Sequence, residues 1–460
     1  MATLTTDGRI CIERELEVTK VNLQYEDLIS RFDIVETCKW ISDNHYLKVC
    51  LQFPDELISV SPKIYNEIKK RIDVDLYILG DTSYASCCID SVAAMHVQGD
   101  AIIHYGHTCL SKSNIPVFLV LPKADLDIEE TFKVLSNTFT PDEELKICLF
   151  YDIQFQHCKG NKIVIKLYEI YPHSYIACVE MEEIPNRFLG RIVKNREGII
   201  MPIEILHECI CIYIGSNGQT AFNLTVSILA KEWQLLQPES GNVERMEQTA
   251  WFKRRRYLVE CCKDASTVGI LVCKLAGDQT KDIIARVKQI CRVNGKKSYI
   301  VSVGKPNVAK LANFPEIDIY VMIACPENDL YSSRDFYKPI IYPFELEIAI
   351  NSNREPYYVH HITDYDELLP GRRYYCEVGD VKETTDVSLI TGKIRETKLD
   401  PTEGQSMELA EKQNWALENI GQNLQNRTWQ GLEQKLGETE VKKAEEGRKG
   451  IALQYSNEPE

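Results

Sequence analysis

Four cysteines of the sequence follow apolar runs instead of lying within them. Cys87 and Cys88 come shortly after an apolar run that ends in Gly-Asp-Thr, and Cys109 follows the next apolar run. Cys325 directly follows a third apolar run, far along the chain. In parallel α/β sheets, ligands bind outside the carboxyl ends of the strands. If these strand ends converge, the thiolates would meet and form a metal site.

The spacing of these cysteines favours some metal centres over others. Structural zinc sites use local Cys-x2–4-Cys pairs, and the sequence around these residues has no such knuckle. Three thiolates on a four-iron, four-sulfur cluster would leave one iron open to a substrate or a small ligand, although four cysteine ligands are usual. We expect adjacent Cys87 and Cys88 to face different ways, so that one points to the site and the other packs against the next helix. Buried thiols without a metal are the alternative.

Other residues offer weaker candidates. His104 and His107 precede Cys109, and His107 could tune or shield a metal centre or could simply be a loop histidine satisfied by a neighbour. His360-His361 lies in a Tyr-rich segment and is interpreted as packing. Gly80–Ser83 lacks the Gly-x-Gly-x-x-Gly pattern, so the sequence predicts no dinucleotide site.

The elements that must position these residues alternate between strand and helix, and the alternation occurs three times. Continuous apolar strands separated by helices, such as those expected at Ser61–Arg71 and Cys88–Val97, are typical of parallel sheets covered on both faces. The predicted class is therefore α/β, with three pseudo-symmetric domains of parallel sheets flanked by helices and a C-terminal extension. The expected strands are Leu47–Phe53, Leu76–Leu79, Ala101–Tyr105, Val117–Leu121, Lys146–Tyr151, Tyr175–Val179, Cys209–Ile214, Val268–Cys273, Tyr299–Val303 and Ile317–Ile323.

The pattern also predicts where the domains lie. The expected division is an N-terminal extension at 1–29, domains at 30–125, 140–262 and 263–350, and a C-terminal extension and tail at 351–460. Within the tail, a helix is expected over Met407–Asn423. The segment Arg427–Glu433, "RTWQGLE", carries a Trp and a Gly in polar surroundings and is interpreted as a docking segment.

Composition limits the function further. The net charge of -15 argues against general nucleic-acid binding. No secretory signal and no run of about 18 apolar residues is seen, so we expect a cytoplasmic chain without membrane contact. The basic run Lys253–Arg256 is interpreted as a solvated helix face, with a docking patch for an acidic partner as the alternative.

The chain has 17 cysteines, an odd count that fits reduced thiols better than a disulfide framework. Most of them lie inside apolar runs, as Cys50, Cys148, Cys178 and Cys273 do. A buried cysteine behaves as a small hydrophobe. We therefore predict that these four belong to the core.

Three stretches together resemble a known family. They are "LGDTSYASCCIDSVAAMHVQGDAIIHYGHTCLS", "IACPENDLYSSRDFYKPIIYPFELEIAI" and "RTWQGLE". They are similar to the eukaryotic 2-(3-amino-3-carboxypropyl)histidine synthases of diphthamide biosynthesis, and within them to the second, non-catalytic subunit. The resemblance implies a radical-type iron–sulfur enzyme complex. Such a complex transfers a 3-amino-3-carboxypropyl group from S-adenosylmethionine to a histidine of translation elongation factor 2.

The resemblance also implies a ligand set. Cys88, Cys109 and Cys325 would bind a 4Fe-4S cluster, with Cys87 as the alternative to Cys88. The catalytic subunit of this family takes one cysteine from each domain, the middle one from a "GCTSP"-like turn. Here that turn reads "GSNGQ", with Ser216 at the cysteine position. A serine hydroxyl is a poor substitute for a thiolate on iron.

This departure suggests an accessory role, in which the cluster passes electrons to the cluster of a catalytic partner subunit in a heterodimer. The implied partners are that subunit, a small iron-binding electron carrier and elongation factor 2. Two other hypotheses stay open: a subunit that itself cleaves S-adenosylmethionine, and a purely structural partner.

Overall fold

The computed structural model describes residues 25–395 with gaps, and residues 450–451 and 454–455. The gaps are 81–85, 112, 141–144, 160–161, 181, 183, 274–278, 304–305, 328–335, 359, 380–385 and 393. The chain forms two compact units, Met1–Asp400 and Pro401–Glu460. The described residues of the second unit form an antiparallel pair, β18 (Gly450–Ile451) with β19 (Gln454–Tyr455).

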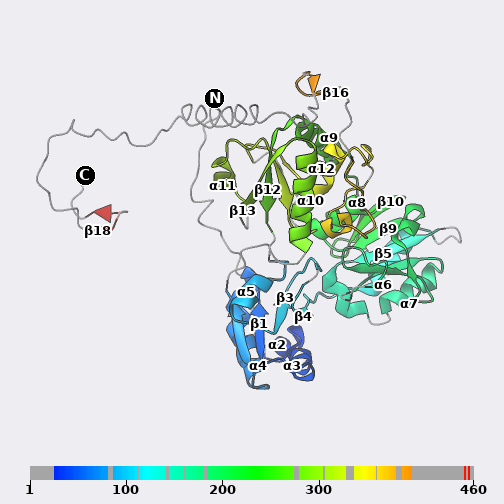
Figure 1. Cartoon of the computed structure of the whole chain (residues 1–460). Helices are drawn as coiled ribbons and strands as arrows, with labels where there is room; N and C mark the ends of the chain where they lie inside the picture. Colours follow the sequence, from blue (N-terminus) through cyan, green and yellow to red (C-terminus); the bar gives the residue numbers. More distant parts are fainter. Residues whose placement is uncertain are drawn as a thin grey trace, which may run out of the picture. The chain divides into compact units, whose positions relative to one another are not determined.

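The first sheet has the strand order β2-β1-β3-β4, and its neighbouring strands are parallel (Figure 1). Its strands are β1 (Lys48–Gln52), β2 (Asp75–Leu79), β3 (Ala101–Tyr105) and β4 (Val117–Val120). The helices of this part are α2 (Tyr25–Arg31), α3 (Ile34–Asp43), the 3₁₀ helix η1 (Asp55–Val60), α4 (Ser61–Lys69) and α5 (Ser91–His96). Strand β3 is buried along its whole length, as expected of a parallel strand covered on both faces.

The middle sheet is wider, with the order β11-β10-β9-β5-β6-β7-β8. Its inner strands β10, β9, β5 and β6 are parallel, and antiparallel strands extend it at both edges. The strands are β5 (Ile147–Tyr151), β6 (Tyr175–Val179), β7 (Arg191–Lys194), β8 (Ile200–Met201), β9 (Ile210–Ile214), β10 (Glu232–Gln237) and β11 (Asn242–Arg245). The helices are α6 (Ile128–Thr138), η2 (Ile153–Lys159), α7 (Lys162–Ile170), η3 (Ile203–Glu208) and α8 (Gln219–Ser227).

The third sheet has the order β13-β12-β14-β15, again with parallel neighbours. Its strands are β12 (Thr267–Val272), β13 (Lys297–Ser302), β14 (Ile319–Ile323) and β15 (Ile340–Ile341). The helices are α9 (Thr249–Asp264), α10 (Gln279–Val293), α11 (Val308–Ala312), α12 (Pro343–Ile350) and η4 (Tyr365–Leu368). A separate antiparallel pair follows, β16 (Asp386–Val387) with β17 (Ile394–Arg395).

The parallel parts of the three sheets share one plan. If the parallel strands of each sheet are numbered in chain order, their order across the sheet is second, first, third, fourth. The first and third strands are therefore central, and their carboxyl ends lie at the same edge. The predicted α/β class with parallel sheets flanked by helices is confirmed.

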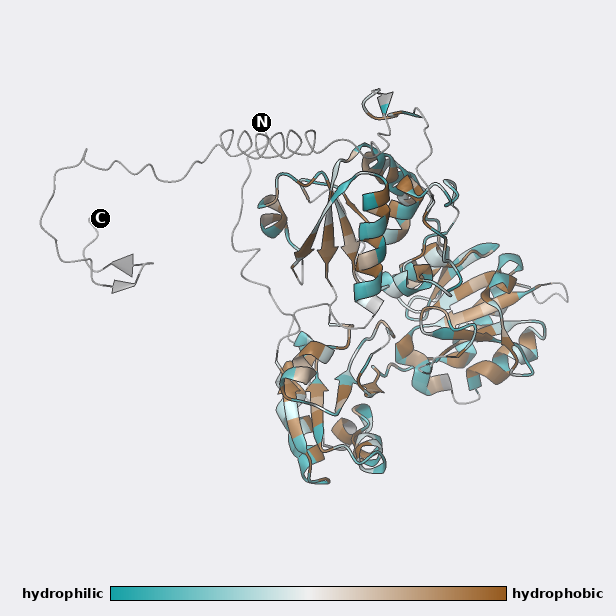
Figure 2. Cartoon of the chain, viewed as in Figure 1, coloured by the Kyte–Doolittle hydropathy of each residue, from teal (hydrophilic) through white to brown (hydrophobic). Residues whose placement is uncertain are grey.

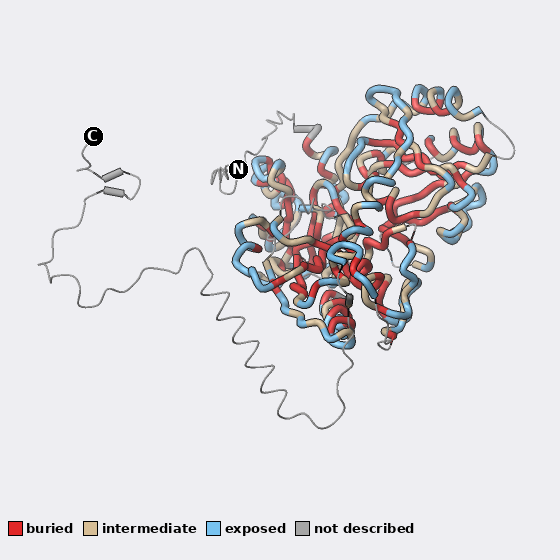
Figure 3. Tube along the Cα trace, turned by 90° about the horizontal axis from the view of Figure 1, so that it is seen from above, coloured by how far each residue is buried: buried red, intermediate tan, exposed pale blue. Residues whose placement is uncertain are grey.

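The cores follow the hydropathy of the sequence. The strands are the most apolar elements (Figure 2) and most of them are buried (Figure 3). On α4, Ile64 and Ile68 lie one helical turn apart on the same face. Both are completely buried in the core beside the first sheet. The prediction of core cysteines is also confirmed, since four of them are less than 7% exposed: Cys50, Cys148, Cys178 and Cys273.

Several elements differ from the sequence prediction. Strands β7, β8, β10, β11 and β15 were not expected, because they are short or alternate between polar and apolar residues. Helix α5 begins at Ser91 and not at Cys88. The side chain of Asp90 accepts a hydrogen bond from the N–H of Ala93, which caps the helix at that point and leaves Cys88 in the preceding turn.

The expectation of a solvated basic face on α9 is wrong for Arg255. This side chain is 4% exposed, and its Nε donates to Oε1 of Glu345 at 2.5 Å. A second guanidinium nitrogen donates to the carbonyl of Ile340 at 3.2 Å. The run is basic at this position because α9 packs against α12, which carries a buried carboxylate.

Two predictions fall outside the described residues, the helix over Met407–Asn423 and the docking segment Arg427–Glu433. The domain boundaries at 30–125, 140–262 and 263–350 stay a prediction.

Candidate metal centre

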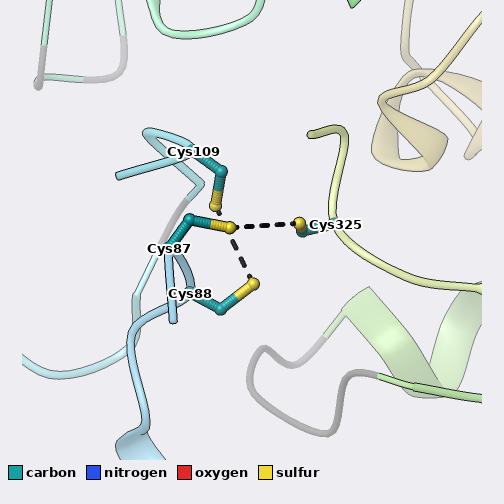
Figure 4. Close-up of side chains that lie close together, drawn as sticks. All are labelled: Cys87, Cys88, Cys109 and Cys325. Carbon is teal, nitrogen blue, oxygen red and sulfur yellow. Dashed lines mark hydrogen bonds between the residues drawn. The ribbon is translucent and has the colours of Figure 1, made fainter. Parts of the chain in front are cut away.

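Four thiols converge where loops of the first and third sheets meet (Figure 4). The Sγ atoms of Cys87, Cys88, Cys109 and Cys325 all lie within 4.8 Å of one another. Sγ of Cys87 is 3.8 Å from that of Cys325, and Sγ of Cys109 is 3.9 Å from that of Cys88. The structure thus brings together the three predicted ligands and also Cys87, which the sequence predicts only as the alternative to Cys88.

The expectation that Cys87 and Cys88 face different ways is wrong. The two residues lie in a turn that precedes α5, not in a strand or helix. Neighbouring side chains alternate in a strand, but a turn allows both to point to one side. Cys88 is buried, whereas Cys87 is partly exposed.

Gln52 fixes this turn from the end of β1. Its Nε2 donates to the carbonyl of Cys88 at 2.7 Å, and its Oε1 accepts from the N–H of Asp90 at 2.9 Å. Gln52 is 1% exposed, so both bonds are shielded from water. Sequence reasoning missed this residue, although a lone amide in an otherwise apolar strand end was a signal.

The loop that carries Cys109 follows β3 and is tied to the turn. The N–H of Cys109 donates to the carbonyl of Cys87 at 3.1 Å. The hydroxyl oxygen of Ser111 lies 3.1 Å from Sγ of Cys109. His104, at the end of β3, places Nε2 3.1 Å from the carbonyl of Ser86. Burial lowers the pKa of His104 below its usual range.

Cys325 follows β14, at the carboxyl end of a central strand of the third sheet. Two residues further on, Oε2 of Glu327 lies 2.7 Å from Nε2 of His107. His107 is thus a loop histidine satisfied by a neighbour, and this contact joins the loops of Cys109 and Cys325. The hydrogen bond to Glu327 raises the pKa of His107 against the opposing effect of burial.

Two of the four thiols, Cys87 and Cys325, have raised pKa values, which favour their protonated form. The pKa of Cys87 lies well above the usual value of a thiol, because its side chain is hydrogen-bonded to those of Cys109, Cys325 and Cys88 and, to a lesser extent, because it is partly buried. Hydrogen bonds with Cys109 and Cys88, together with burial, raise the pKa of Cys325 in the same way. A metal would replace these protons and supply the missing positive charge.

The donor set fits a soft metal centre. Four sulfur donors without oxygen or nitrogen suit zinc or iron–sulfur chemistry. The sulfur distances of 3.8 and 3.9 Å are close to the edge of about 3.8 Å expected for four thiolates around one tetrahedral ion. A four-iron cluster requires the sulfurs to lie farther apart, because each binds a different iron.

Other predicted residues are not among the four converging thiols. Ser216 is exposed in the turn after β9, where its carbonyl accepts from the N–H of Gly218 at 2.8 Å. His361 is completely buried and its ring packs edge-on against Trp251 and Phe344, as interpreted from the sequence. His360 packs against Tyr374. No helix of the described residues is long and apolar enough to cross a membrane.

Comparison with known proteins gives the family. A family model described as "Putative diphthamide synthesis protein" matches residues 53–359. The chain belongs to this diphthamide synthesis family. The family predicted from the sequence motifs is thus confirmed.

Relatives within the diphthamide synthesis family match the chain over nearly its full length. The "2-(3-amino-3-carboxypropyl)histidine synthase subunit 2" of Danio rerio is 36% identical over 470 residues, covering 94% of this chain and 92% of that protein. The protein of that name from Homo sapiens is 30% identical over 492 residues, covering 99% and 98%.

Solved structures agree in fold. A crystal structure of Dph2 from Pyrococcus horikoshii with a 4Fe-4S cluster matches with a TM-score of 0.56 and 19% identity. The match covers 74% of this chain and 95% of that chain. At this identity the match establishes the common fold.

Proposed function

We propose that this chain is an accessory iron–sulfur subunit in the first step of diphthamide biosynthesis. The complex transfers a 3-amino-3-carboxypropyl group from S-adenosylmethionine, by a radical route, to a histidine of elongation factor 2 in the cytoplasm. The partners are a catalytic subunit, in a heterodimer, and a small iron-binding electron carrier. The observation that carries the proposal is the convergence of four thiols in a relative of synthase subunit 2.

Cys88, Cys109 and Cys325 hold the cluster in this proposal, and Cys87 supplies the fourth sulfur. The cluster, when bound, supplies one-electron redox chemistry. The protein tunes its potential through hydrogen bonds to sulfur and through solvent exposure. Ser111, whose hydroxyl contacts Cys109, is one such group.

The fourth thiol favours electron relay over cleavage of S-adenosylmethionine by this chain. With four thiolates, no iron of the cluster is left open for a substrate. This observation supports a chain that passes electrons to its partner.

The test compares the chain alone with the chain bound to its catalytic partner, both purified without oxygen. Variants Cys88→Ala, Cys109→Ala and Cys325→Ala are measured for iron content and for group transfer to elongation factor 2. Cys158→Ala, a partly exposed thiol on η2, is the control. We expect the three variants to lose iron and the complex to lose transfer, while the control keeps both.

Three outcomes would overturn parts of the proposal. Cleavage of S-adenosylmethionine by the lone chain contradicts the relay. Unchanged iron content in the variants contradicts the ligand assignment. Loss of iron without loss of transfer, whatever the reductant, favours the purely structural partner.

A further inference from the structure

The residue after Cys109 is held in an unusual backbone conformation. Leu110 has φ 54°, in the left-handed region, which a bulky side chain seldom adopts. Its side chain is 3% exposed and belongs to the apolar core of the middle sheet, not to that of the first. The surrounding contacts must hold this conformation, since the chain would otherwise relax from it.

The side chain of Leu110 packs against a tight turn of the middle sheet. Phe188 and Arg191 pair through both backbone hydrogen bonds, at 2.8 and 2.9 Å. The two residues between them, Leu189 and Gly190, have φ 46° and 74°, as in the type I′ turns of two-residue hairpins. A Cβ atom on Gly190 would lie 2.4 Å from Cβ of Leu110, so no other residue fits there without displacing the leucine.

Arg187 links the backbone at Leu110 to the middle sheet by hydrogen bonds. Its Nη2 donates to the carbonyl of Leu110 at 2.8 Å, and its Nε donates to the carbonyl of Glu180 at 2.9 Å. The N–H of Glu180 in turn donates to the carbonyl of Gly190 at 2.9 Å. One guanidinium therefore joins the backbone that follows Cys109 to the hairpin of the middle sheet.

We propose that Leu110, Gly190 and Arg187 are positioning residues that hold the Cys109 thiol in the metal centre. On the other side of this loop, His107 contacts Glu327 near Cys325. The loop is thus fixed from both the middle and the third sheet. The middle sheet, which contributes none of the four converging thiols, supports the site through this anchor. The nature of the metal rests on the proposed function, but the anchoring of the thiol does not.

The test uses two glycines with similar backbones. Gly190→Ala introduces the clash with Leu110. Gly198→Ala, at φ 79°, imposes comparable backbone strain, but a Cβ there meets nothing within 4 Å. The full chain is loaded with iron and sulfide without oxygen, and the rate of iron release to a chelator is measured together with thermal unfolding. We expect Gly190→Ala to release iron about 10–100-fold faster, the range for residues that orient metal ligands, and Gly198→Ala to match wild type.

A second pair of variants separates positioning from general stability. Arg187→Ala removes the hydrogen bonds to the carbonyls of Leu110 and Glu180 without introducing a clash. We expect faster iron release, with the melting temperature of the metal-free chain unchanged. Arg187→Lys, which can still reach one carbonyl, should restore part of the retention. The double variant Gly190→Ala, Leu110→Gly relieves the clash without restoring the anchor, so its release should stay fast.

Equal release rates for Gly190→Ala, Gly198→Ala and wild type would overturn the anchor. Full rescue by Leu110→Gly would also overturn it, because the clash alone would then explain the defect. If wild type holds no iron, the proposed function fails. The same variants are then titrated with Co²⁺ alone, whose thiolate absorption reports the site. Weaker Co²⁺ binding by Gly190→Ala than by Gly198→Ala supports the anchor, and equal binding contradicts it.

Discussion

At the scale of single residues, the site includes Cys87 and Gln52 besides the three predicted ligands Cys88, Cys109 and Cys325. Cys87 places its sulfur 3.8 Å from that of Cys325 and completes a set of four. Gln52 makes both of its bonds to the turn that carries Cys87 and Cys88. Each of these roles gives a test.

Cys87→Ala should open one iron of the cluster. We expect the electron paramagnetic resonance spectrum of the reduced wild-type chain to be insensitive to S-adenosylmethionine, because every iron has a thiolate. In Cys87→Ala the spectrum should shift on addition of S-adenosylmethionine, and iron should be lost more readily on oxidation. Identical spectra for variant and wild type, in both conditions, would show that Cys87 is no ligand.

Gln52→Leu should loosen the thiol turn. The change leaves the carbonyl of Cys88 and the N–H of Asp90 buried without this partner, at a cost of about 2–4 kcal/mol in the free energy of unfolding. Urea denaturation of the metal-free chain measures this cost, and iron release should accelerate as well. Lys63→Ala, an exposed position on α4, is the control. A loss below that range with normal iron retention would refute the role of Gln52.

At the scale of elements, the apolar strands could be predicted from the sequence and the polar or short ones could not. Strand β5 is apolar and buried throughout, and its run was recognised. Strand β10 alternates, and β15 has only two residues, so neither shows a continuous apolar run. The three cysteines were found because they follow apolar strands. Leu110 and Glu327 were not, because their partners lie in distant parts of the chain.

Helix α12 carries two buried carboxylates that organise its neighbours. Glu345 accepts from Arg255 on α9, and Glu347 accepts from Arg286 on α10 at 2.5 Å. Arg255→Ala leaves the carboxylate of Glu345 buried without its cation, so we expect a loss of about 3–5 kcal/mol in unfolding free energy. Arg245→Ala, which removes exposed ion pairs with Glu232 and Glu247, should cost about 1 kcal/mol or less. Similar losses for the two variants would contradict this account.

The segment that contains His361 should make stability depend on pH. The N–H of His361 donates to Val226 of α8 at 2.7 Å, and its ring faces Arg255, Glu345 and His360. Burial, Arg255 and His360 hold the pKa of His361 well below 6.5. Below pH 6.5 the histidine is therefore protonated in the unfolded chain but stays neutral in the folded chain. Because the unfolded state binds more protons, the free energy of unfolding falls as the pH drops from 6.5 toward the pKa of the folded state.

Replacing His361 tests this direction of the pH dependence. Between pH 6.5 and pH 5, we expect the free energy of unfolding of His361→Phe to fall less steeply than that of wild type, by about 1 kcal/mol per pH unit. Phe344→Leu, in the same aromatic cluster, should lower stability equally at both pH values. An unchanged slope in His361→Phe would mean that this histidine does not sense pH.

At the scale of the whole molecule, the three related sheets contribute unequally to the centre. The first gives Cys87, Cys88 and Cys109, the third gives Cys325, and the middle contacts the site through Leu110. In this account the middle sheet, in which Ser216 replaces a cysteine, supports the site through the turn at Leu189 and Gly190 and not through a ligand. Such an arrangement suits a subunit that holds a closed cluster and leaves substrate chemistry to its partner.

The central claim is that four thiols of this chain hold an iron–sulfur cluster. The most direct measurement is iron and sulfide content, with Mössbauer spectra, of the chain isolated without oxygen, for wild type and for Cys325→Ala. The account predicts a 4Fe-4S cluster in wild type and its loss in the variant. A single tetrahedral ion in wild type, or a cluster that persists in Cys325→Ala, would contradict it.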